Sequence, residues 1–171
     1  VLGGALDCDA ADKAGRFVSL CDKLGLPMVS LCDTPGFMVG PDSEVQGAAL
    51  RMATMFKAGA KIQIPLVAVI LRKAYGLGAM AMTAGSLKVP VFTAAWPTGE
   101  TGPMGLEGAV TLGFKKELDA MKDPKEREAL FNQLVDEMYQ RGKATESAAA
   151  TEIDAVIDPA DTRKVIMRAL A

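Results

Sequence analysis

The stretch "IPLVAVILRKAYGLGAMAM", residues 64–82, decides the fold of this chain. It begins with an apolar run, opened by Pro65 and ending at Leu71, that has the length and composition of a fully buried strand. Two cations, a tyrosine and two glycines follow, and a short helix is predicted over residues 76–84. A strand that passes through glycine straight into a helix leaves the first backbone N–H groups of that helix unpaired, so they can bind negative charge.

Strand and helix patterns alternate on both sides of this stretch. Strands are predicted at residues 27–32 and 89–95, and helices at residues 9–24 and 44–61. The first helix is expected to start at an Asp9 cap, to end at Gly25, and to bury Ala14, Phe17, Val18, Cys21 and Leu24. Strands separated by helices imply parallel pairing with right-handed crossovers, so the three strands should be neighbours whose following loops share one rim of the sheet.

The last third of the sequence is mainly helical. A long amphipathic helix is predicted from Pro124, in its first turn, to Arg141. The segment "EIDAVIDPADTRKVIMRAL" predicts a short strand, a turn and a final helix started by Pro159 and Asp161. These patterns complete an α/β fold.

Composition limits the possible functions. The chain has 171 residues, of which 50% are hydrophobic, as expected for one compact domain. Its net charge is −2 without a basic run, which argues against a nucleic-acid partner. The apolar run at residues 65–71 is too short to span a membrane, and nothing resembles a signal peptide, so a cytoplasmic protein is predicted.

The sequence contains no histidine, which removes several kinds of active site. A Ser-His-Asp triad, a histidine-ligated metal and a histidine acid–base pair are excluded for this chain acting alone. The three cysteines, Cys8, Cys21 and Cys32, lack the spacing of zinc ligands and are interpreted as small core residues. No metal site is predicted.

Three glycine-rich loops should meet at the rim of the sheet: "DTPGFMVG", "KAYGLGAM" and "WPTGETGPMG". An oxyanion hole needs two N–H donors that converge on one oxygen, and the second donor could come from Gly36 or Phe37 in the first loop. The alternative interpretation is structural, because such glycines also make tight turns and let a helix pack closely.

Charged residues near the rim allow more than one interpretation. Arg72 and Lys73 could bind phosphate or carboxylate, or could simply face solvent. Asp33 could be catalytic, but an aspartate that opens a turn before proline usually caps backbone N–H groups. Glu100 and Glu107 lie in or beside the third loop, and no acid–base role is assigned to them.

The three loops resemble those of the carboxyltransferase subunits of biotin-dependent acyl-CoA carboxylases. The resemblance extends from "GGALDCDAADKAGRFVSLCD" through "LCDTPGFMVG", "LRKAYGLGAMAM" and "AWPTGETGPMGLEGAV" to "EIDAVIDPADTR". It implies a crotonase-like (ClpP/crotonase) spiral ββα fold with a mostly parallel sheet. Family members have two such halves, and residues 1–171 resemble the C-terminal half alone, as a single domain without the N-terminal half.

The resemblance also implies a reaction. In this family carboxybiotin releases carbon dioxide beside an enolisable acyl-CoA, the ureido nitrogen of biotin takes the α-proton, and the enolate captures the carbon dioxide, so no protein base is needed. The C-terminal half supplies backbone N–H groups to the ureido oxyanion, and a neighbouring subunit's N-terminal half binds the acyl-CoA. The residues that match the catalytic turn are Gly76, Leu77, Gly78 and Ala79, and those expected to contact biotin or substrate are Gly36, Phe37, Tyr75 and Met80.

The expected partners are a biotin carboxyl carrier, a biotin carboxylase component, an acyl-CoA and further copies of the full-length chain. One departure limits the inference. Relatives that act on propionyl-CoA carry two adjacent glycines followed by Ala, Tyr and Asp in this turn, whereas this sequence has "GLGAM" with Met80 at the position of that Asp. The family's preference for a particular acyl chain therefore cannot be assigned to this chain. The positions of the two N–H donors are uncertain by one residue.

Three other functions are compatible with parts of the sequence. A biotin-dependent acyl-CoA decarboxylase would run the same transfer in reverse. A non-catalytic assembly module would use this half only for subunit contacts. A free-standing hydratase or isomerase of the crotonase type would need a pair of catalytic carboxylates, and none is evident in the sequence.

Overall fold

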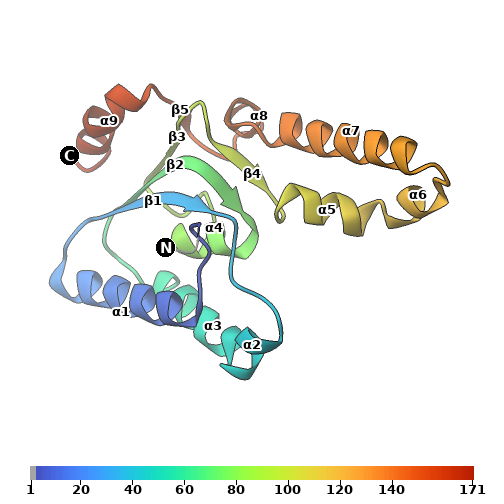
Figure 1. Cartoon of the computed structure of the whole chain (residues 1–171). Coiled ribbons are helices and arrows are strands. Elements are labelled where there is room, and N and C mark those ends of the chain that lie inside the picture. The colour runs from blue at the N-terminus through green and yellow to red at the C-terminus, as the bar shows by residue number, and fades with distance from the viewer. Residues whose placement is uncertain (1–2) are drawn as a thin grey trace.

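The computed structural model describes residues 3–171, which fold around a sheet of parallel strands (Figure 1). β1 (Met28–Thr34), β2 (Leu66–Tyr75), β3 (Phe92–Ala95) and β5 (Ala155–Val156) lie across the sheet in that order. β4 (Glu100–Gly102) pairs in parallel with the last residues of β2. The prediction that the first three strands are parallel neighbours is confirmed.

β2 is the central strand, and its sequence reflects that position. Val67, Val69 and Ile70 are fully buried, because strands pair with β2 on both sides and a parallel sheet is covered on both faces. The strand does not end at Leu71, as the apolar run predicts, but continues to Tyr75. The last residues of β2 pair with β4, so the strand continues up to the glycine turn.

Helices cover the sheet and extend beside it. They are α1 (Cys8–Leu24), α2 (Pro41–Val45), α3 (Ala48–Gly59), α4 (Gly76–Met82), α5 (Leu106–Gly113), α6 (Lys115–Ala120), α7 (Pro124–Gly142), α8 (Ala144–Ala149), a 3-10 turn (Pro159–Asp161) and α9 (Thr162–Ala169). In Figure 1, α4 lies between the sheet and the α1–α3 pair, and α5, α6 and α7 extend away from the sheet. A small core of Ala11, Met55 and Ala81 joins α1, α3 and α4. On the opposite side of the strands, α9 packs against β2.

The ends of α1 are set by local hydrogen bonds. The Asp7 carboxylate accepts the N–H of Ala10 at 2.7 Å, so Asp7 is the N-cap and the prediction of Asp9 is wrong by two residues. Gly25 ends the helix in the left-handed conformation, with φ of 67°, as predicted.

The predicted apolar face of α1 is only partly covered. Cys21 is buried, but Phe17 is 58% exposed and Leu24 is 62% exposed. The neighbouring edge strand β1 also exposes Val29 and Leu31. The prediction that Phe17 and Leu24 are buried is therefore wrong for residues 3–171, because no described element packs over this apolar surface.

The single helix predicted over residues 44–61 is two helices, α2 and α3. The break occurs at Gly47, whose φ of 75° is incompatible with a continuous right-handed helix. Val45, which the periodicity places on the apolar face, is 90% exposed at the end of α2. The predictions for the last third are confirmed: α7 starts at Pro124, and a short strand and α9 close the chain.

Candidate functional site

The first two glycine loops lie against each other at the carboxyl ends of β1 and β2. A Cβ atom on Gly78 would lie 2.7 Å from the Cα of Gly36 and 3.3 Å from the backbone nitrogen of Phe37. A Cβ on Gly36 would lie 3.7 Å from the carbonyl oxygen of Tyr75. The expectation that Gly36 and Gly78 share one rim is therefore confirmed, and the two backbones touch without an intervening side chain.

Hydrogen bonds in the first loop distinguish between its two candidate donors. The N–H of Gly36 donates to Oγ1 of Thr34 at 3.1 Å, so it is already used. Leu6 bridges the loop by donating to the Gly36 carbonyl at 3.0 Å and by accepting the Met38 N–H at 2.8 Å. In such a parallel bridge the central residue, Phe37, directs its own N–H away from Leu6. The geometry therefore favours Phe37 over Gly36.

Helix geometry makes a similar distinction in α4. The helix starts at Gly76, so its first intrahelical hydrogen bond runs from the Ala79 N–H to the Tyr75 carbonyl. The N–H groups of Gly76, Leu77 and Gly78 have no intrahelical acceptor. Ala79 is thus a poor candidate donor, and the choice narrows to the first three residues of the helix.

The third loop supports the turn from β2 into α4. Gly76 has a φ of 56°, and a Cβ there would lie 2.6 Å from the carbonyl oxygen of Pro103. Gly102 lies opposite Tyr75 in the β2–β4 pair, and a Cβ on it would lie 3.3 Å from the Tyr75 ring. The structural interpretation of the glycines is thus correct for Gly76, Gly78 and Gly102, and it is compatible with a role for the N–H groups between them.

Tyr75 is buried in the predicted site, at 3% exposed. Burial raises the pKa of its phenol, as do, less strongly, the nearby carboxylates of Glu100 and Glu107. The ring lines a cavity of about 380 Å³ together with Lys73 and residues of α7. The structure therefore places Tyr75 at the wall of this cavity.

The other predicted contact residues differ in exposure. Leu77 is 62% exposed and Met80 is 44% exposed, whereas Gly78 and Ala79 are buried. Met38, which follows Phe37 in the first loop, is also partly exposed, at 39%.

Asp33 and Arg72 connect β1 to β2 just before the two turns. The Asp33 carboxylate accepts hydrogen bonds from Nε and one terminal nitrogen of Arg72, both at 3.3 Å, and from the backbone N–H of Lys73 at 3.1 Å. Of the alternatives left open, the structure therefore supports the cap for Asp33 and gives Arg72 an intramolecular partner.

Sequence reasoning missed Thr34 and Pro103. Thr34 is buried, at 2% exposed. Its hydroxyl orients Gly36 by accepting a hydrogen bond from the Gly36 N–H and by donating one to the Gly36 carbonyl oxygen. The "DTPG" sequence contains the signal for this, since a threonine hydroxyl often bonds the backbone two residues on. Pro103 gave no signal, because its position beside Gly76 depends on the pairing of β4 with β2.

Cys32 is predicted to be chemically inert. Its side chain is fully buried, and burial, followed by the charge of Asp33, raises the pKa of the thiol from 9.0 to about 12. The native chain should therefore leave Cys32 unmodified by iodoacetamide at pH 8, while the chain unfolded in guanidinium reacts. Mass spectrometry of the peptide checks this, and equal labelling in both states would contradict it.

The same shift predicts alkaline destabilisation. Because the folded-state pKa of Cys32 exceeds the unfolded value, its contribution to stability is complete below about pH 9 and is lost as the pH rises toward 12.

All three cysteines are free and buried, which confirms their interpretation as core residues. Across residues 3–171 no group of three or more His, Cys, Asp or Glu side chains is arranged to hold a metal ion. Within the same part of the chain, no helix combines the length and the apolar composition needed to cross a membrane.

Comparison with known proteins gives a consistent result. The family described as "Carboxyl transferase domain" matches residues 1–171. The methylmalonyl-CoA carboxyltransferase 12S subunit of Propionibacterium freudenreichii subsp. shermanii is 41% identical over 99% of this chain and 32% of its own length. The alpha subunit of methylmalonyl-CoA decarboxylase from Veillonella parvula is 37% identical over 100% of this chain and 31% of its own.

Solved structures agree in fold. A single-chain, multi-domain long-chain acyl-CoA carboxylase matches with a TM-score of 0.85 and 57% identity, over 98% of this chain and 16% of that one. The transcarboxylase 12S crystal structure, a hexamer with methylmalonyl-coenzyme A bound, matches with a TM-score of 0.88 and 38% identity, over 99% and 32%. The predicted crotonase-like fold is thereby confirmed, and the chain spans about a third of the length of the curated relatives it matches.

Proposed function

Because this chain belongs to the carboxyl transferase domain family, we propose that the full-length protein transfers a carboxyl group from carboxybiotin to an acyl-CoA, and that residues 1–171 form the biotin side of the site. One observation carries the proposal: the N–H of Phe37, which makes no hydrogen bond within residues 3–171, lies beside Gly78, in the first turn of α4. Two donors from two strand ends can bind one oxygen.

The residues present fit the biotin head group. Biotin, when bound, supplies both the carboxyl group and, at its ureido nitrogen, the base that accepts the α-proton. The N–H of Phe37 and that of Leu77 or Gly78 hold the ureido oxygen and stabilise its negative charge. Leu77 and Met80 are exposed beside these donors, and their apolar side chains exclude water from the bound ring.

Other parts of the chain keep the donors in position. The Thr34 hydroxyl fixes Gly36, and Leu6 fixes the residues on both sides of Phe37. Tyr75 and Gly102 hold the end of β2, so α4 starts at a constant place. Donors fixed in this way need no reorganisation when charge develops, which is how an oxyanion hole accelerates a reaction.

We infer that the rest of the full-length protein, the N-terminal half, binds the acyl-CoA, and that a biotin carrier, a biotin carboxylase component and further copies of the full-length chain complete a cytoplasmic enzyme. A relative named "Biotin-dependent acetyl-/propionyl-coenzyme A carboxylase beta6 subunit" and the hexameric 12S structure support this inference. Biotin then arrives on a partner rather than on this chain.

The test is a carboxylation assay of the full-length protein with its partners, labelled bicarbonate and a panel of acetyl-, propionyl- and long-chain acyl-CoA. The proposal expects label in an acid-stable product from at least one acyl-CoA. Avidin, which sequesters biotin, should abolish incorporation. Turnover of an acyl-CoA that avidin leaves unchanged would contradict a role for biotin.

A decarboxylase is the second candidate, since a 37% identical relative bears that name. It would use the same N–H donors but transfer the carboxyl group from the acyl-CoA to biotin. The two functions separate when the panel is repeated with malonyl-CoA and methylmalonyl-CoA. Net release of carbon dioxide without net carboxylation would identify the decarboxylase.

Residues 1–171 alone are predicted to have no measurable carboxyltransferase activity, because the acyl-CoA side is expected in the rest of the protein. The measurement compares the purified chain with the full-length protein, using free biotin and labelled methylmalonyl-CoA. A circular dichroism spectrum confirms that the shorter chain is folded. Turnover at a comparable rate by the shorter chain would contradict the division of the site.

A further inference from the structure

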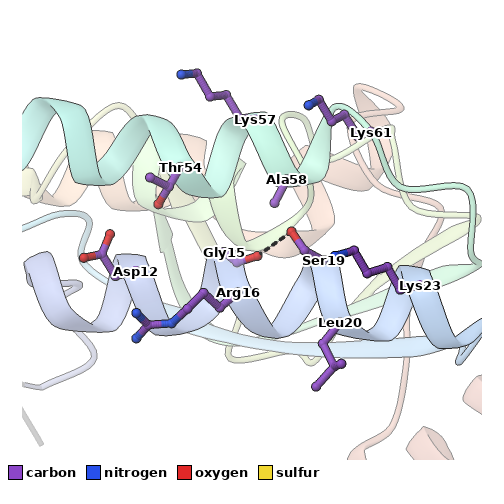
Figure 2. Close-up of a pocket in the computed structure, with 10 residues that line it drawn as sticks. All are labelled: Asp12, Gly15, Arg16, Ser19, Leu20, Lys23, Thr54, Lys57, Ala58 and Lys61. Carbon is purple, nitrogen blue, oxygen red and sulfur yellow. Dashed lines mark hydrogen bonds between the residues drawn. The ribbon is translucent and has the colours of Figure 1, made fainter.

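A groove runs between α1 and α3, on the side of the layer that faces away from the sheet. Gly15 allows the two helices to approach closely, since a Cβ on it would lie 3.2 Å from Oγ1 of Thr54. Gly15 and Ala58 are buried at the base of the groove, and Ser19 and Thr54 are exposed beside them. The resulting cavity measures about 640 Å³ (Figure 2).

Four cationic side chains border this groove. Arg16 and Lys23 come from α1, and Lys57 and Lys61 come from α3 and the residues after it (Figure 2). All four are exposed. Of the ion pairs within residues 3–171, none includes any of them. An overall charge of −2 makes this local excess of positive charge distinct from the rest of the chain.

The other end of the same two helices shows the contrast. There Arg51 of α3 pairs with Asp9 at 3.2 Å and with Asp12 at 2.9 Å, both from α1. Asp12, the one carboxylate that lines the groove, is therefore already engaged. The cations farther along the groove have no such partner in the part of the chain that the structure describes.

Helix electrostatics explains only part of this arrangement. Lys23 and Lys57 lie in the last turns of α1 and α3, where a positive charge stabilises the helix. Arg16 lies in the middle of α1, and Lys61 follows the end of α3. The four charges are thus gathered around the groove rather than at helix ends alone.

We propose that this groove binds an acidic helix of a partner protein. Arg16 and Lys23 are seven residues apart on one helix, about 10 Å along its axis. A compact anion contacts only one or two of the four cations, whereas a helix with carboxylates on successive turns reaches all of them. The cations are exposed, and among the described residues that line the groove no polar side chain is buried, which suits a protein surface better than a small polar ligand.

The shape of the groove fits the same partner. Gly15, Ser19 and Ala58 are small, so a third helix can approach closely between α1 and α3. Leu20 is 53% exposed at the edge and provides an apolar contact. This binding does not depend on the proposed reaction, because the groove contains none of the residues assigned to it.

The test uses the full-length protein and a fluorescein-labelled helical peptide of about 20 residues, with glutamate on one face and alanine and leucine on the other. The double variant Lys57→Glu, Lys61→Glu is expected to raise the Kd about tenfold. Lys115→Glu with Lys116→Glu makes the same charge change on the exposed α6 and is expected to change the Kd less than about twofold. The unmodified protein should bind the same peptide with glutamine in place of glutamate more weakly than it binds the glutamate peptide.

Four results would overturn the proposal. Equal loss of binding in the two double variants would mean that only net charge matters. If one tripolyphosphate per chain displaced the peptide and bound more tightly than the peptide does, the groove would be a small-anion site. Binding to phosphatidylserine vesicles without binding to the peptide would indicate a membrane surface. Failure of the unmodified protein to bind the peptide also contradicts the proposal, and a carboxylation assay on the same samples reports separately on the enzymatic function.

Discussion

Carboxyl transfer by the full-length protein is expected to slow by about 10² to 10³ when Leu77 is replaced by proline. The substitution removes one N–H from the first turn of α4, where helix geometry leaves that group without an intrahelical acceptor. Proline is tolerated in the first turn of a helix. Leu77 is 62% exposed, so the change of side chain disturbs little packing.

Leu77→Ala is the matched control, because it shortens the same side chain and keeps the N–H. It should retain turnover within a few-fold of the unmodified protein. The melting temperatures of both variants, measured on the same preparations, show whether the proline variant is folded. A well-folded Leu77→Pro variant with turnover close to that of Leu77→Ala would contradict the assignment of this N–H as a donor.

The free energy of unfolding is expected to fall by about 1 to 3 kcal/mol when Gly78 is replaced by alanine. The new Cβ would lie 2.7 Å from the Cα of Gly36 and 2.9 Å from its carbonyl carbon, so one of two backbones must move. For a chain of this length the loss corresponds to a decrease in melting temperature of about 2 to 10 °C. Activity should decrease as well, because the displaced loop carries Phe37.

Gly108→Ala provides the comparison for this second variant. Gly108 lies inside α5, and no atom lies within 4 Å of where its Cβ would be. Alanine favours a helix over glycine by about 0.5 to 1 kcal/mol, so this variant should be as stable as the original or slightly more stable. If Gly78→Ala and Gly108→Ala melted at the same temperature, the close contact between the two glycine turns would be refuted.

The contact at Gly78 also changes what a proline there would mean. A Gly78→Pro substitution removes one N–H from α4, and proline is tolerated in the first turn of a helix. The structure adds a steric cost, since any side chain at this position meets the backbone of Gly36. Loss of activity in a Gly78 variant therefore cannot be separated from loss of stability, and Leu77 is the position where the N–H can be tested.

The sequence predicted the arrangement of the sheet because that arrangement depends on patterns within single segments. The apolar run before Arg72 identifies a central strand, and helices between strands require parallel neighbours. Adjacent loops at one rim follow from that order, which is why Gly36 and Gly78 were expected together.

Features set by contacts between distant segments could not be predicted in this way. β4 is three residues long, "ETG", and has no apolar alternation to mark it as a strand. Its existence depends on β2 continuing past Leu71. Similarly, the direction of the Phe37 N–H depends on the two hydrogen bonds that Leu6, about 30 residues earlier in the chain, makes with Gly36 and Met38.

The most direct test of the central claim is to locate biotin on the protein. A photoreactive biotin analogue, with the reactive group next to the ureido ring, is cross-linked to the full-length protein, and the labelled peptides are identified by mass spectrometry. The account predicts label in the two glycine turns, at residues 34–39 and 75–80, that excess biotin suppresses. Biotin-suppressible label confined to other segments, with none in either turn, would contradict it.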